Sequence, residues 1–191
     1  PTLEEERPLR ELQIPDEDRK RLRGFQLLSE KPLLVVMNVD EDLLKAGAEI
    51  DHLYSRDRRE VVVISAPIEE EISHLDPEHQ EEFLADLGLE ESSLDRVIQA
   101  SYSLLGLISF FTVGEDEVRA WTVRSGTSAR QAGAAIHSDI ERGFIRAEVT
   151  AWDDLLELGS LASCREKGLL RLEGKEYPVR DGEIVHFRFN V

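Results

Sequence analysis

Two short, uninterrupted apolar runs constrain the fold of this chain more than any other feature. The first covers residues 32–38 and ends in Asn38, and the second covers residues 61–66 and ends in Ser65 and Ala66. Runs without alternating polar residues are typical of strands that are covered on both faces, as in a parallel sheet. The residues between the runs suffice for a crossover helix. We therefore predict a parallel α/β arrangement, which binds ligands at the carboxyl ends of its strands, where Asn38 and Ser65 lie.

Helical segments are predicted on both sides of these runs. Residues 16–28 follow Pro15 and place Leu22, Phe25 and Leu28 on one face, so we expect one helix there. Residues 67–106 hold eleven acidic side chains but only one basic side chain. Their apolar residues recur at helical spacings, which predicts amphipathic helices with a solvated acidic face. The alternative is an acidic docking surface for a basic partner.

Charge and cysteine content exclude several classes of protein. The net charge of −17, from 40 acidic and 23 basic side chains, argues against a protein that coats nucleic acid or an anionic membrane with its whole surface. Any such contact needs a local basic patch. Cys164 is the only cysteine, which excludes an intramolecular disulfide and a multi-cysteine metal site. Because no apolar stretch reaches about 18 residues and no signal-peptide pattern occurs, we expect a cytoplasmic protein without membrane contact or bound metal.

The last third of the chain changes to short β-type segments that are separated by glycines. These segments are residues 109–113, 118–123, 144–149, 169–172 and 184–189. One helix-like stretch covers residues 128–136, and Asp181-Gly182 is a typical tight-turn pair. We predict a mixed sheet crossed by a single helix, an α+β module of residues 107–191.

Several segments of this module carry a family resemblance. They are residues 110–115, 117–122, 136–139, 142–147, 174–177 and 187–191. Together they resemble the TGS domain that ends the YchF subfamily of Obg-like ATPases, and residues 27–32, 38–41 and 87–91 resemble the second half of that subfamily's nucleotide-binding domain. The resemblance implies a helical lead-in at 1–28 and the C-terminal part of an Obg-type P-loop NTPase domain, with a Rossmann-like parallel sheet, at 29–106. A β-grasp, ubiquitin-like TGS domain is implied at 107–191.

The phosphate-binding motif of such a domain is missing from this sequence. A P-loop reads G-x-x-x-x-G-K-[ST], because backbone N–H groups of its glycines cradle the phosphates. The only Gly-Lys pair, Gly174-Lys175, is followed by Glu176, and Leu169 stands where the first glycine is needed. By resemblance, this half of the site would precede Pro1 in a complete subfamily member. We expect ATP or GTP with Mg²⁺ in that full-length protein, and no catalytic residue, bound cofactor or hydrolysis in this chain alone.

The base-recognition half of the site is expected at residues 38–41. GTPases of the superfamily carry Asn-Lys-x-Asp here, and the Asp accepts hydrogen bonds from guanine; this chain reads Asn38-Val39-Asp40-Glu41. The longer carboxylate changes the reach, and adenine offers an acceptor where guanine offers a donor. The resemblance implies that Asn38, the main chain of Val39 and Glu41 contact adenine, flanked by Ser65 and Ala66. A polar loop after a buried strand is the alternative interpretation.

Basic side chains of the last third are the candidates for contact with RNA phosphates. They are Arg119, Arg124, Arg142, Arg146 and Lys175, with Arg130 and Arg180 as further members. Solvated charges that balance nearby acids are the alternative. His137, which precedes Ser138 and Asp139, is expected to cap a helix rather than to catalyse. Two functions follow: the C-terminal portion of a ribosome-associated ATPase of the YchF type, or a stand-alone TGS-type module that binds the ribosome or structured RNA.

Overall fold

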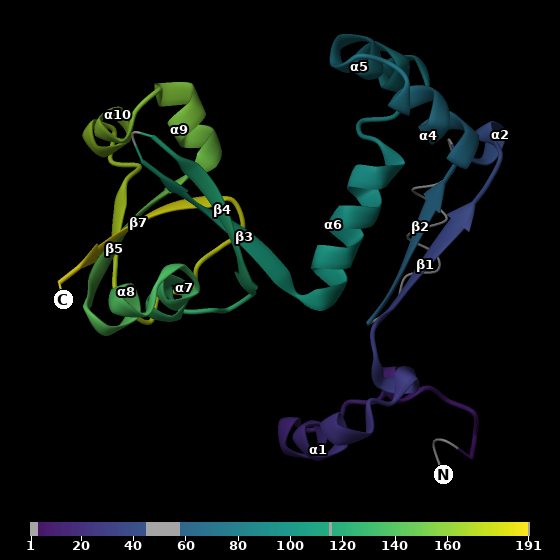
Figure 1. Cartoon of the computed structure of the whole chain (residues 1–191), viewed down its shortest axis with the longest axis horizontal. Coiled ribbons are helices and arrows are strands. Elements are labelled where there is room, and N and C mark those ends of the chain that lie inside the picture. Colours follow the sequence, from purple (N-terminus) through teal and green to yellow (C-terminus); the bar gives the residue numbers. More distant parts are fainter. Residues whose placement is uncertain (1–3, 45–57, 115, 191) are drawn as a thin grey trace. The chain divides into compact units, whose positions relative to one another are not determined.

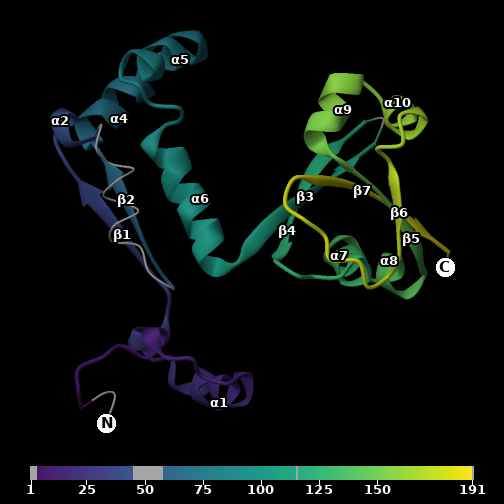
Figure 2. The ribbon, with the colours of Figure 1, turned by 180° about the vertical axis from the view of Figure 1, so that it is seen from behind.

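The computed structural model describes residues 4–44, 58–114 and 116–190. Its contacts divide the chain into two compact units, Pro1–Leu105 and Gly106–Val191. The first is called unit 1 and the second unit 2, and each is described by itself (Figure 1 and, from behind, Figure 2). No helix within the described ranges is long and apolar enough to cross a membrane.

Unit 1 contains a two-stranded parallel sheet formed by the two apolar runs. Strand β1 (Leu33–Asn38) pairs with β2 (Arg59–Ile64) over the full length of both, from Leu33 opposite Arg59 to Asn38 opposite Ile64. The predicted parallel pairing is thereby confirmed. Helix α2 (Glu41–Leu44) begins soon after β1. The predicted crossover helix falls mostly on residues 45–57, which lie outside the described residues.

The two strands differ in burial, which corrects the expectation that both are covered on both faces. Val61, Val62 and Val63 of β2 are at most 4% exposed, whereas Val36 of β1 is 45% exposed and Met37 is 37% exposed. In the described two-stranded sheet each strand pairs with one neighbour, so the difference in burial comes from the helices. Val63 of β2 packs against Ile68 and Ile72 of α4. Continuous apolarity alone does not reveal which of the two strands the helices cover more fully.

The acidic middle of the chain is helical, as predicted, and its described residues form three helices. They are α4 (Ala66–Ser73), α5 (Pro77–Asp86) and α6 (Ser93–Leu105). Ile68 and Ile72 of α4 pack with Val63 in a buried cluster, which Phe83 and Leu87 border. Helix α6 packs against both strands. The acidic side chains therefore face away from an apolar core that covers the end of β2.

The lead-in segment departs from the single helix predicted for residues 16–28. Helix α1 spans Asp16–Leu22 and is followed by two 3₁₀ turns, η2 (Arg23–Phe25) and η3 (Leu28–Glu30), while a further turn, η1 (Leu9–Glu11), precedes it. Gln26 adopts a left-handed conformation with φ of 52°, which ends the helical path. Phe25 and Leu28 are more than 70% exposed, so the expected apolar face is not buried.

Unit 2 is built on a five-stranded mixed sheet. Its strands are β3 (Leu107–Val113), β4 (Val118–Arg124), β5 (Phe144–Ala151), β6 (Arg171–Glu173) and β7 (Glu183–Phe189). Their order is β4-β3-β7-β5-β6, and the central pair β3 and β7 is parallel while all other pairs are antiparallel. The mixed sheet predicted for the last third is confirmed.

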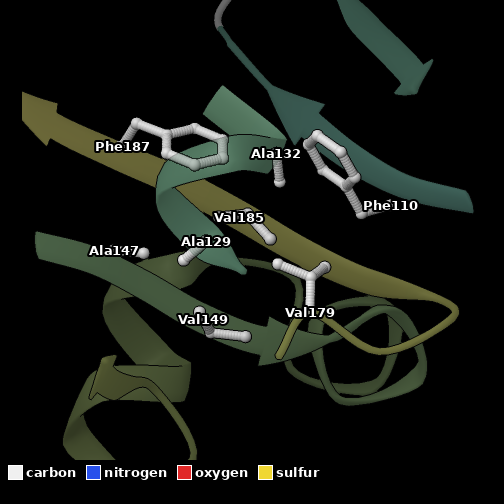
Figure 3. Close-up of a cluster of buried hydrophobic side chains, with 8 residues drawn as sticks. All are labelled: Phe110, Ala129, Ala132, Ala147, Val149, Val179, Val185 and Phe187. Carbon is white, nitrogen blue, oxygen red and sulfur yellow. The ribbon is translucent and has the colours of Figure 1, made fainter. Parts of the chain in front are cut away.

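The core of unit 2 lies between this sheet and helix α7 (Ala129–Ile136). Its buried members are Phe110, Ala129, Ala132, Ala147, Val149, Val179, Val185 and Phe187 (Figure 3). Small side chains on α7 let the helix approach the sheet closely, and the larger aromatic rings fill the space beside them. Ser128 begins α7 with a capping box that it forms with Gln131.

The prediction of a single helix in this module is wrong. The structure has three more helices in the described part of unit 2: α8 (Ser138–Arg142), α9 (Trp152–Leu158) and α10 (Leu161–Glu166). Figure 1 shows α7 and α8 on one side of the sheet, and α9 and α10 on the other. Helices of five to seven residues are too short to establish a 3.6-residue period, so they are identified by caps such as Ser160 and the left-handed Gly159.

Candidate functional site

The carboxyl ends of β1 and β2 are tied together by the first residue of the predicted base-recognition motif. The Oδ1 atom of Asn38 accepts a hydrogen bond from the backbone N–H of Ala66, with an N···O distance of 3.0 Å. The backbone N–H of Val39 donates to the carbonyl oxygen of Ile64 at 2.8 Å. These two bonds bring residues 38–41 and 65–66, which are far apart in sequence, to one edge of the sheet.

These hydrogen bonds also determine which atoms of the motif remain for a ligand. Since Oδ1 of Asn38 is engaged, the Nδ2 amide group of the exposed side chain is left as a donor. The N–H of Val39 is engaged as well, which leaves its carbonyl oxygen as an acceptor. Glu41 begins α2 with an exposed carboxylate, and the buried Ser65 precedes α4 without making a capping hydrogen bond.

A hollow of about 400 Å³ lies beside this edge. It is lined by Asp40, Glu41, Ser65, Pro67, Ile68, Glu71, Phe83 and Leu87. Two of the five predicted base-binding residues, Glu41 and Ser65, belong to this lining, whereas Asn38, Val39 and Ala66 do not. The sequence does not identify the apolar wall from α4 and α5, because the helical spacing of Phe83 and Leu87 is the same whether these residues pack in a core or line a ligand site.

The charge of the residues that line this hollow indicates which part of a nucleotide fits there. Asp40, Glu41 and Glu71 are acidic, and no lysine or arginine is among the described lining residues. Such a surface repels phosphates, but it suits a neutral heterocycle that presents amino groups to carboxylates and a flat apolar face to Phe83. Nowhere in the described part of the chain do three His, Cys, Asp or Glu side chains gather as a metal ion would require.

The five predicted RNA-contacting residues lie on different elements of unit 2. Arg119 and Arg124 belong to β4, Arg142 to α8, Arg146 to β5, and Lys175 to the connection between β6 and β7. All five side chains are exposed. They are not gathered into one cluster, so each has to be assessed from its own surroundings.

Arg119 and Arg142 each contact an identified side chain within unit 2. The Arg119 guanidinium stacks over the ring of Trp121, with Cζ 4.2 Å from the ring centroid. Arg142 forms an ion pair with Asp139 three residues earlier, and its hydrogen bond holds the pKa of the Asp139 carboxyl below the ordinary value. His137 accepts a hydrogen bond through Nδ1 from the N–H of Asp139, which confirms the prediction that it caps a helix.

A buried carboxylate on β5 gathers two arginines that the sequence did not single out. Oε1 of Glu148 accepts a hydrogen bond from Nη2 of Arg165 on α10 at 2.8 Å and another from Nη2 of Arg188 on β7. Burial alone would raise the pKa of the Glu148 carboxyl, but the two guanidinium groups outweigh this effect and lower it. Local spacing cannot reveal this group, since it joins residues up to 40 positions apart.

The comparisons with known proteins agree over almost the whole chain. Residues 107–190 match a family model described as "YchF-GTPase_C: Protein of unknown function (DUF933)". The "Ribosome-binding ATPase YchF" of Bacillus subtilis (strain 168) is 48% identical over 195 residues, covering 99% of this chain and 53% of its own. The "Obg-like ATPase 1" of Caenorhabditis elegans is 36% identical, covering 98% of this chain and 49% of its own.

A solved structure has a similar fold. The "Structure of the Schizosaccharomyces pombe YchF GTPase" matches with a TM-score of 0.78 and 30% identity, over 97% of this chain and 50% of that chain. The present chain thus spans about half of the length of the relatives that it matches. The similarity includes both units and is not limited to the range of the family model.

Proposed function

This chain is related over almost its entire length to the YchF family of ribosome-binding ATPases, and we propose that it is the base-reading and ribosome-binding part of such an ATPase. In this proposal, residues 29–106 are the C-terminal part of a P-loop NTPase domain preceded by a lead-in at 1–28, and residues 107–191 are a TGS domain of the β-grasp type. The stand-alone RNA-binding module is not favoured, because the similarity extends through unit 1.

The observation that carries the proposal is the hydrogen bond from Ala66 to Asn38, which joins the two halves of the base-recognition motif. A purine would take a hydrogen bond from Nδ2 of Asn38 at its N7 acceptor, which adenine and guanine share. The free carbonyl of Val39 and the carboxylate of Glu41 are both acceptors. They suit the 6-amino group of adenine, a donor, and they repel the oxygen that guanine carries at the same position. Ser65 and Ala66 would flank the base.

The cofactor of the complete protein is therefore proposed to be ATP, or GTP with lower affinity, together with Mg²⁺. The described residues of the hollow supply contacts for the base and nothing for the phosphates, since its charged members are all acidic. The bound ATP would supply the phosphoanhydride bond that is cleaved. This chain's own residues would bind the base, orient it, and exclude water from its apolar face.

Unit 2 is proposed to mediate binding to the ribosome. Curated relatives such as that of Bacillus subtilis carry ribosome binding in their printed names. Unit 2 offers the exposed basic side chains that contact with RNA requires, among them the predicted Arg119, Arg124, Arg142, Arg146 and Lys175. Its net charge is −3, while residues 67–106 alone carry −10. The repulsion between acidic side chains and RNA phosphates is thus weakest in this part of the chain.

Changing Glu41 to Asp tests the adenine assignment. In the complete protein that contains this chain, we expect ATP to bind more tightly than GTP, and Glu41→Asp to weaken ATP binding about tenfold or more, since a hydrogen bond to a charged group contributes roughly 1.5–3 kcal/mol. GTP binding should weaken less, so that the preference moves toward GTP. The affinities of both nucleotides are measured by titration calorimetry.

Glu70→Asp is the matched control, because Glu70 lies on α4 outside the lining of the hollow and undergoes the same shortening of its side chain. Its nucleotide affinities should equal those of the wild type. A firm GTP preference in the wild-type protein would overturn the adenine assignment.

A further inference from the structure

The sheet of unit 2 has a face with an unusual arrangement of charge. Ala147 and Val149 of β5 and Val185 and Phe187 of β7 point into the core that α7 covers. Since side chains alternate along a strand, Arg146 and Glu148 of β5 and Arg188 of β7 lie on the opposite face. The hydrogen bond from Arg165 of α10 to Glu148 agrees with this placement.

Two arginines stand directly opposite each other on this face. Arg146 of β5 is the register partner of Arg188 of β7. Side chains at such positions have Cβ atoms about 4.5–5.5 Å apart, and like charges there destabilise a sheet. Within the described residues, Arg146 has no hydrogen-bond or ion-pair partner, although carboxylates outnumber basic groups in the chain.

The carboxylate of Glu148 does not neutralise the arginines on this face. Glu148 is 6% exposed and is shared by Arg188 and Arg165, whose side chains remain 53% and 59% exposed. The three arginines and one glutamate together carry a charge of +2. The acidic first turn of α9 follows Ala151, which lies about 17 Å along β5 from Arg146. The buried carboxylate of Glu148 therefore orients the exposed guanidinium groups of Arg165 and Arg188, but it does not neutralise their charge.

We infer that Arg146, Arg188 and Arg165 form a phosphate-binding surface for RNA, through which unit 2 contacts the RNA of the ribosome. This inference rests on the proposed function and narrows it to one face of one sheet. A phosphodiester between Arg146 and Arg188 supplies the negative charge that relieves their repulsion, and guanidinium groups bind phosphate oxygens in a bidentate manner. Arg188 and Arg165 are added to the residues expected from the sequence.

The test measures how the 191-residue chain binds a fluorescent RNA duplex of about 20 base pairs and purified bacterial ribosomes, across a range of salt concentrations. Each phosphate contact contributes close to one to the slope of log K against log salt. For Arg146→Gln/Arg188→Gln, we expect this slope to fall by about two. The affinity for both targets should fall by roughly 50- to 100-fold near 0.1 M salt and converge with the wild type near 1 M.

Lys20→Gln/Arg23→Gln is the matched control, because it removes two exposed positive charges from unit 1. It should leave affinity and slope unchanged. Urea unfolding checks that each variant is folded. We expect the variants that carry Arg188→Gln to fold, because the buried Glu148 carboxylate keeps Arg165 as its partner.

The outcomes separate this inference from the proposed function. If the double variant binds as the wild type does, or if the wild-type chain binds ribosomes but not the RNA duplex, the phosphate-binding surface is wrong while ribosome binding stands. If the wild-type chain binds neither target, both the surface and the proposed ribosome contact of this chain are wrong.

Discussion

Replacing Phe110 with alanine is expected to lower the free energy of unfolding of unit 2 by about 3–5 kcal/mol, the range for deleting a buried phenylalanine side chain. Phe110 is fully buried on β3, and its ring packs edge-on against Phe187 of β7, with centroids 6.0 Å apart and planes at 69°. These two strands form the parallel centre of the sheet. The substitution therefore leaves a cavity where the two halves of the sheet meet (Figure 3).

Tryptophan fluorescence during urea unfolding measures this loss selectively, because both tryptophans of the chain, Trp121 and Trp152, lie in unit 2. Leu156→Ala is the control. Leu156 of α9 is 73% exposed in the same unit, so its removal should change the stability of unit 2 by less than about 0.5 kcal/mol. A loss below about 1 kcal/mol for Phe110→Ala would contradict the described core.

Gly143→Ala is expected to destabilise unit 2 by about 1–3 kcal/mol or more. A Cβ atom at this position would collide with the backbone carbonyl group of Asn190, just after β7. The two residues are held together by a hydrogen bond of 2.9 Å from the N–H of Asn190 to the carbonyl oxygen of Gly143. Because the obstacle is backbone, it cannot move aside as a flexible side chain would. The end of β7 has to separate from the sheet.

Gly174→Ala provides the comparison for this prediction. A Cβ atom on Gly174 would meet no atom within 4 Å, so the urea midpoint of this variant should match that of the wild type. Equal midpoints for the two alanine variants would mean that Asn190 is not packed against Gly143. The Gly143 variant should also lose affinity for RNA, because Arg188 lies two residues before Asn190.

Features that consecutive residues determine could be predicted from the sequence, whereas features that depend on contacts between distant segments could not. The parallel pairing of β1 and β2 could be predicted because each apolar run is a property of consecutive residues. The burial of β1 could not, because it depends on how the helices cover the sheet. The extra helices α8, α9 and α10 were missed for a related reason, since each is shorter than two full turns.

The residues of the candidate sites divide in the same way, into those that a local motif identifies and those that only the fold brings together. Asn38, Val39, Glu41, Ser65 and Ala66 could be nominated from a motif and its resemblance, and the bond from Ala66 to Asn38 brings their two segments together. Phe83 and Leu87 of the hollow could not be nominated, because core and ligand-facing residues have the same helical spacing. The opposition of Arg146 and Arg188 is a consequence of strand register, which is set by the packing of the whole sheet.

The most direct test of the account is to locate the base of bound ATP in the complete protein. Irradiation with 2-azido-ATP attaches the purine to the residues that surround it, and mass spectrometry of the peptides identifies them. We expect the label on residues 38–41 and 65–66 or on the apolar wall formed by Phe83 and Leu87, with competition by ATP stronger than competition by GTP. A label confined to residues outside the carboxyl ends of β1 and β2 and the hollow beside them would contradict the proposed base-reading role.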